Sequence, residues 1–91
     1  GIDYYDSDTI AAWKNSLLLA VLKEEKLVQL KLDASGRSIT SASDFLVHQF
    51  GRLRDLAISP AGDVYVCTDN GSNGDMIIKL TATKTDILMD K

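Results

Sequence analysis

Residues 16–33 read SLLLAVLKEEKLVQLKLD, and this stretch decides the fold class. It begins with a β-compatible apolar run, continues through the polar triplet EEK, and ends in a segment whose residues alternate between two faces. One face carries Leu27, Gln29 and Lys31, and the other carries Val28, Leu30 and Leu32. An apolar run, a tight polar turn and an alternating run predict a β-hairpin.

The pattern continues on both sides of Gly51. Turn-forming residues at 33–36 precede a Ser/Thr-rich segment, 38–47, which is predicted as a weaker strand. After residue 51 comes a second cycle: RLRDLAIS, a Pro-Ala-Gly turn, DVYVCTD, a polar loop, MIIKLTA and TDILMD. In the first of these strands, regular alternation puts Leu53, Asp55 and Ala57 on one face and Arg52, Arg54, Leu56 and Ile58 on the other.

Two similar cycles predict an all-β, antiparallel fold. In each cycle an apolar strand leads through a polar loop to a strand that ends in Lys-Leu and a polar residue. A repeat of about 40–50 residues with up to four short strands indicates β-propeller blades, about two of them here. An antiparallel sandwich gives similar strands without the repeat, so it remains the alternative.

The first fifteen residues are acidic and aromatic and show no sustained period. Asp8 or Thr9 is expected to cap a short helical turn over residues 10–13, and Trp13 to pack on the strands after it. We therefore divide the chain into a lead-in, residues 1–15, and a blade segment, residues 16–91.

Composition excludes several function classes. The 91 residues carry 10 Lys and Arg against 13 Asp and Glu, a net charge of −3, which argues against a nucleic-acid partner. The longest apolar run, residues 17–22, is far shorter than the roughly 20 residues of a membrane span, and no signal peptide is expected within these residues. One cysteine, Cys67, and one histidine, His48, cannot make an internal disulfide or a zinc site of the usual type.

Three pieces of the sequence resemble one known family. WKNSLLLAVLK begins at Trp13, LKLD ends at residue 33, and GRLRD with SPAGDVYVCTD spans residues 51–69. In this order and approximate spacing they resemble the C-terminal part of the soluble quinoprotein glucose/sorbosone dehydrogenases. The resemblance covers Trp13 to Leu80.

The resemblance implies a six-bladed β-propeller that binds pyrroloquinoline quinone (PQQ) and oxidises a sugar or related alcohol by hydride transfer. It places cofactor contacts on Lys23, Arg52 and Arg54. The family's catalytic histidine and calcium-binding positions have no match here, so no catalytic residue and no metal ligand is assigned. The chain alone is expected to be inactive, the remaining blades and a sugar are its implied partners, and the implied location is periplasmic or secreted.

The residue types suit that role without requiring it. PQQ carries three carboxylates, which cations and planar donors bind well. Arginines two residues apart share one face of a regular strand, and an ammonium can stabilise charge growing on a quinone. The alternative for Lys23 is local pairing with Glu24 or Glu25, and for the arginines an exposed face paired with Asp55 or Glu24.

Other features favour structural roles. The loop 69–75 fails the EF-hand pattern, because Gly71 stands at position 3 and Leu80 at position 12, and two Asn-Gly turns are expected instead. Cys67 is predicted as a buried strand residue and His48 as a surface residue at a strand end. The alternative function is a non-catalytic, self-associating binding module, because isolated blades expose sheet edges.

Overall fold

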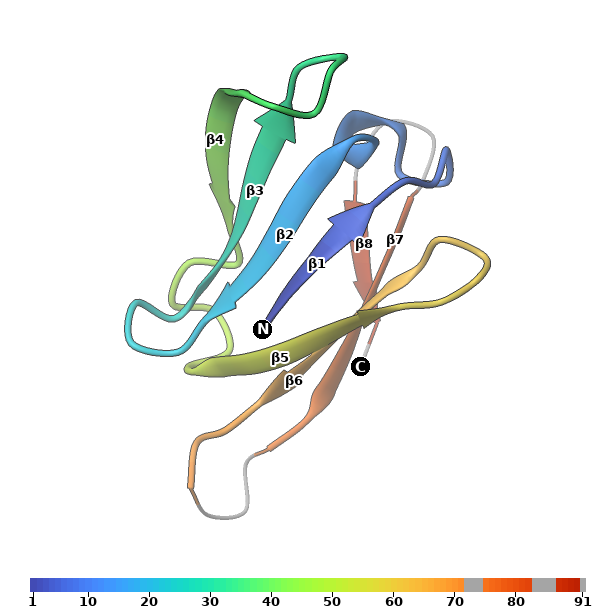
Figure 1. Ribbon diagram of the computed structural model, residues 1–91. Coiled ribbons are helices and arrows are strands. Elements are labelled where there is room, and N and C mark those ends of the chain that lie inside the picture. Colours follow the sequence, from blue (N-terminus) through green and yellow to red (C-terminus); the bar gives the residue numbers. More distant parts are fainter. Residues whose placement is uncertain (72–74, 83–86, 91) are drawn as a thin grey trace.

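The chain folds into two four-stranded antiparallel sheets in the computed structural model, which describes residues 1–71, 75–82 and 87–90 (Figure 1). The first sheet contains β1 (Ile2–Tyr5), β2 (Ser16–Val21), β3 (Lys26–Leu32) and β4 (Ile39–Phe45) in that order. The second contains β5 (Leu53–Ile58), β6 (Val64–Thr68), β7 (Ile77–Ala82) and β8 (Ile87–Asp90). Each sheet is a meander with the layout of a propeller blade, so the all-β prediction is confirmed.

The predicted hairpin forms from β2 and β3. Its register pairs Val21 with Lys26 and Ser16 with Lys31, which leaves residues 22–25 as the connecting turn. Along β2, buried residues alternate with half-buried ones, because only one face of the first sheet is covered by the second sheet. The predicted strand over residues 38–47 is also confirmed as β4.

The core lies between the two sheets. Figure 1 shows β5 crossing near β1 and β2, and these strands contact one another. The buried apolar residues of the two sheets that form the core are Tyr5, Leu18, Ala20 and Leu27 from the first and Leu53, Leu56, Val64, Val66, Ile78 and Leu80 from the second. The free energy gained by removing this apolar surface from water is the main contribution that holds the two blades together.

Aromatic side chains complete the junction between the sheets. Tyr5 and Trp13 are fully buried and meet edge to face, with ring centroids 6.2 Å apart. Trp13 also packs on Phe45 at 5.2 Å, which confirms that it packs on the strands after it. The Tyr5 hydroxyl donates to the carbonyl of Gly62, in the β5–β6 turn, and accepts from the amide of Ile10. A single side chain thus joins both blades.

The start of the chain is more ordered than the sequence indicated. Residues 2–5 form β1, which pairs with β2 along its whole length, from Ile2 opposite Leu19 to Tyr5 opposite Ser16. The helical turn is a 3₁₀ turn, η1 (Ala11–Trp13), preceded by Ile10 without a side-chain cap. The expected capping residues bond elsewhere: Thr9 donates to Ala61, and Asp8 pairs with Lys14.

The sequence predicted that side chains would alternate regularly along β5, and this prediction is wrong. Leu53 pairs with Thr68 and Asp55 with Cys67, so Arg54 is the extra residue of a bulge. The bulge puts Leu53 on the buried side together with Leu56, while Asp55 is exposed. One inserted residue reverses the side to which each residue before it points.

The turn after β3 supplies a pH-dependent contribution to stability. Ser35 Oγ donates to Asp33 Oδ1 at 2.8 Å and the amide of Arg37 donates at 3.2 Å. These bonds, led by that from Ser35, lower the pKa of Asp33 from its ordinary value of 3.8. Because the folded state favours the charged carboxylate, its contribution is present above the ordinary pKa and is lost as the pH falls through the lowered value.

We therefore expect Asp33→Asn to lower the unfolding free energy at neutral pH. The gap to wild type should close as the pH falls below 3.8, and urea titrations at a series of pH values measure it. A gap that stays constant into strong acid would contradict the role of the charged carboxylate.

Candidate functional site

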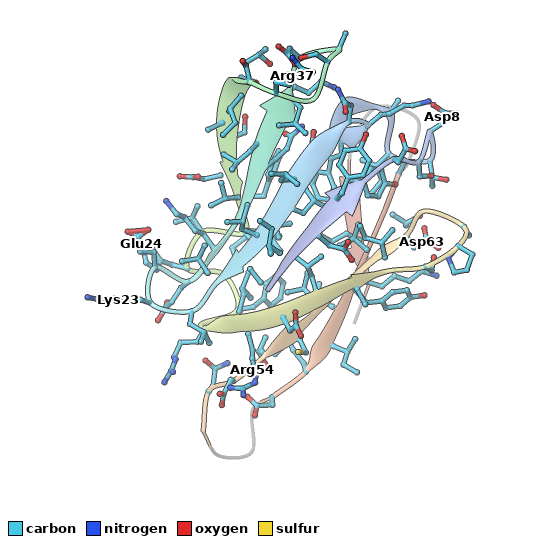
Figure 2. All side chains as sticks on the ribbon, in the orientation of Figure 1. Asp8, Lys23, Glu24, Arg37, Arg54 and Asp63 are labelled. Carbon is cyan, nitrogen blue, oxygen red and sulfur yellow. The ribbon has the colours of Figure 1, made fainter. Side chains whose placement is uncertain are left out.

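The three cations assigned by resemblance lie on two separate chain segments, the β2–β3 turn and the start of β5. Lys23 stands in the β2–β3 turn, Arg52 directly precedes β5, and Arg54 is the bulged residue of β5. All three side chains are exposed. Figure 2 shows Lys23 and Arg54 toward one end of the molecule and Arg37, in the β3–β4 turn, at the other. The sequence predicted that the two arginines would be alternate residues of one regular strand. This prediction is wrong, because Arg52 precedes β5 and Arg54 is its bulged residue.

Lys23 does not pair with its neighbouring glutamates. Glu24 lies 3.6 Å from Lys26, and Glu25 lies 3.1 Å from His48. Among the described residues Lys23 makes no ion pair or side-chain hydrogen bond. The alternative of local pairing is thus not observed in this part of the chain, and the ammonium is available to an anion.

The backbone that presents Arg52 is held by Asn70. The Asn70 side chain accepts from the amide of Arg52 at 2.9 Å and donates to the carbonyl of Phe50 at 3.0 Å. The amide of Asp69 adds a bond to the carbonyl of Arg52 at 2.9 Å. These bonds fix the main chain at Arg52 while its guanidinium keeps no partner among the described residues.

Arg54 is held by a carboxylate instead. Its Nη1 lies 2.7 Å from Asp69 Oδ2, with 61% of the Arg54 side chain and 35% of the Asp69 side chain exposed. Neither Asp55 nor Glu24, the partners considered from sequence, makes this pair. Since the pair is exposed, it contributes little to stability, but it orients the guanidinium.

The donor set fits a polycarboxylate ligand. Two cations without a partner among the described residues and a third that is oriented by Asp69 can satisfy several carboxylate oxygens by charge-assisted hydrogen bonds. Arginine offers a planar fork and lysine a compact charge, which suits a planar tricarboxylate such as PQQ. By charge and donor type, the residues present therefore fit the cofactor that the resemblance implies.

The structure also shows the surroundings of His48 and Cys67. His48 is exposed and bonded to Glu25, as predicted for a surface residue. Cys67 is half-buried in a shallow hollow on the outer face of the second sheet, so the prediction of a buried residue is wrong. No group of three possible metal ligands occurs within residues 1–71, 75–82 and 87–90, and residues 72–74 of the loop, which include the expected second Asn-Gly turn, lie outside them.

Asp69 and Asn70 are supporting residues that sequence reasoning does not single out. In the sequence they are only part of a polar loop. The sequence offers one signal for them, the Thr-Asp-Asn segment at the end of β6. This signal can be interpreted only once β5 is paired with β6, because that pairing brings Asp69 and Asn70 beside Arg52 and Arg54.

Two four-stranded antiparallel meanders, packed face to face, define a protein of the β-propeller class. The chain matches the family model of Glucose / Sorbosone dehydrogenase over residues 1–79. It is also similar to the aldose sugar dehydrogenase YliI of Escherichia coli (strain K12), with 29% identity over 72 residues. The chain belongs to the glucose/sorbosone dehydrogenase family, and the blade prediction is confirmed with it.

The match extends over most of this chain and little of its relative. It covers 79% of the chain and 19% of the E. coli protein, so the chain spans about a fifth of that relative's length. In the described residues no helix is long and apolar enough to cross a membrane.

Proposed function

We propose that the chain forms part of the PQQ site of a quinoprotein sugar dehydrogenase, with Lys23, Arg52 and Arg54 as cofactor contacts. The proposal rests on the exposure of two cations and on their lack of a partner among the described residues. Lys23 and Arg52 are exposed and have no partner among the described residues, although acidic side chains lie nearby in the sequence. Unpaired cations on a fixed backbone favour an external polyanion as their partner.

These residues would bind and orient the cofactor, not exchange the substrate's proton. When bound, PQQ supplies a two-electron acceptor for the hydride of an alcohol carbon, while the hydroxyl proton passes to a base. We assign that base, the calcium ligands and most substrate contacts to further blades of the natural gene product, acting in the periplasm or outside the cell. The guanidinium groups and the ammonium hold the carboxylates and neutralise negative charge.

Arg52→Ala in the complete natural gene product tests the proposal. We expect the dissociation constant for PQQ to rise about 10–100-fold, since a charge-assisted hydrogen bond is worth about 1.5–3 kcal/mol. Calorimetric titration with PQQ measures the constant, and oxidation of glucose with PQQ and calcium measures turnover.

Arg37→Ala is the matched control. It also removes an exposed arginine, but from the β3–β4 turn at the opposite end of β3, and it should leave PQQ binding unchanged. Equal effects of both substitutions, or no PQQ binding by the wild-type protein, would refute the site.

A second candidate function rests on the outer face of the first sheet. Its exposed apolar residues include Ile2 at 62%, Tyr4 at 45% and Ile39 at 56%, which favours a self-associating, non-catalytic module if no further blade covers this face. The intact mass of the natural gene product decides between the two. A mass near 9.9 kDa would support self-association, and a mass several times larger would support the dehydrogenase.

A further inference from the structure

The β2–β3 turn is tied to the connection between β4 and β5 at one point. The amide of His48 donates to the carbonyl of Glu25 at 2.9 Å, and His48 Nδ1 lies 3.1 Å from Glu25 Oε1. Main chain and side chain therefore both join these two residues, which are 23 positions apart. Glu25 is partly exposed and His48 largely so.

Both residues occupy strained backbone conformations. Glu25 and His48 each have φ near +55°, and Leu46 in the same connection has φ of +60°. Left-handed conformations are costly for residues other than glycine and persist where surrounding contacts enforce them. The contact between Glu25 and His48 is one such enforcing interaction.

The contact joins the turn that carries Lys23 to the connection that leads into the segment of Arg52 and Arg54. Lys23 belongs to the turn that the amide of Glu25 closes by donating to Leu22, and His48 precedes Arg52 by four residues. We propose that Glu25 and His48 are positioning residues that hold the turn of Lys23 against the segment of Arg52, so that both cations reach one ligand. This inference rests on the proposed PQQ site.

The neighbouring charged residues do not compete with His48 for the Glu25 carboxylate. Glu24 is near Lys26, which in turn pairs with Asp44 at 3.1 Å. Removing the Glu25 carboxylate would by charge alone favour an anion bound at Lys23, because one nearby negative charge disappears. A weaker affinity for PQQ after that substitution would therefore report lost positioning.

Three substitutions at Glu25 separate positioning from folding. In the natural gene product, Glu25→Ala should weaken PQQ binding about three- to tenfold, the range for one lost hydrogen bond. Glu25→Gln, whose carbonyl can still accept from His48, should bind within about twofold of wild type. Glu25→Gly should weaken binding as much as alanine while keeping or raising the melting temperature, because glycine relieves the positive φ.

Glu24→Ala is the charge-matched control on the same turn, and it should leave the affinity unchanged or slightly tighter. The decisive measurement repeats Glu25→Ala in a Lys23→Ala background. If Glu25 acts through Lys23, Glu25→Ala should change the dissociation constant for PQQ by no more than about twofold in the Lys23→Ala background, because the effects of coupled residues are not additive.

Full additivity in the Lys23→Ala background, or a Glu25→Gly protein that binds PQQ as wild type does, would overturn the positioning role. Those outcomes still leave the proposed function standing, provided that Lys23→Ala and Arg52→Ala weaken binding. If wild type does not bind PQQ, the proposed function itself fails and the inference fails with it.

Discussion

Replacing Trp13 by alanine is expected to lower the free energy of unfolding by about 3–5 kcal/mol, the range for deleting a large buried aromatic side chain. Trp13 is 1% exposed and touches Tyr5 and Phe45. Its removal leaves a cavity where η1 meets the first sheet, against the ring of Tyr5, whose hydroxyl bonds the second blade. Urea denaturation of the natural gene product, followed by circular dichroism, measures the loss.

Trp13→Phe is the control for this prediction. The indole Nε1 is buried and has no hydrogen-bond partner among the described residues, so phenylalanine removes an unsatisfied donor while keeping an aromatic ring. We expect a much smaller loss than with alanine. Equal losses for both variants would show that the indole shape, not apolar burial, holds this part of the core.

Gly51→Ala is expected to lower the unfolding free energy by about 2–4 kcal/mol, combining backbone strain with lost hydrogen bonds. Gly51 has φ of +76°, and a Cβ placed on it would overlap Asn70 Oδ1. That oxygen accepts from the amide of Arg52, so displacing Asn70 also releases the segment that presents the arginine. PQQ binding should fall together with stability, as measured by calorimetric titration and urea denaturation.

Gly36→Ala separates the two contributions. Gly36 has nearly the same φ, +74°, but nothing lies within 4 Å of a Cβ added there. It should cost only the conformational penalty, about 1 kcal/mol, and leave PQQ binding unchanged. A Gly51→Ala protein no less stable than the Gly36→Ala protein would contradict the role of Asn70.

The hairpin and the second blade were predictable because their signals are local. Alternation in residues 27–32 and the apolar runs of β6 and β7 reflect burial on one face, which a sequence records directly. The short strand β1 was not predictable. Four residues with one buried side chain carry no period, and their pairing partner, β2, begins eleven residues later.

The bulge at Arg54 was unpredictable for a related reason. An extra residue is visible only when two strands are aligned, since it is defined by the partner strand. The candidate cations were identified from the resemblance. That Glu24 and Glu25 pair with Lys26 and His48, and not with Lys23, depends on where these side chains lie in space.

The sequence by itself determined the all-β class, the two-cycle organisation, the family and the three cations, because these depend on residue type, order and short-range periodicity. Only the tertiary structure decided that β1 joins the first blade, that Asn70 and Asp69 hold the arginine segment, and that Glu25 meets His48. The side-chain contacts among these join residues 15 to 23 positions apart. Strand pairing and blade packing, not local preference, bring such residues together.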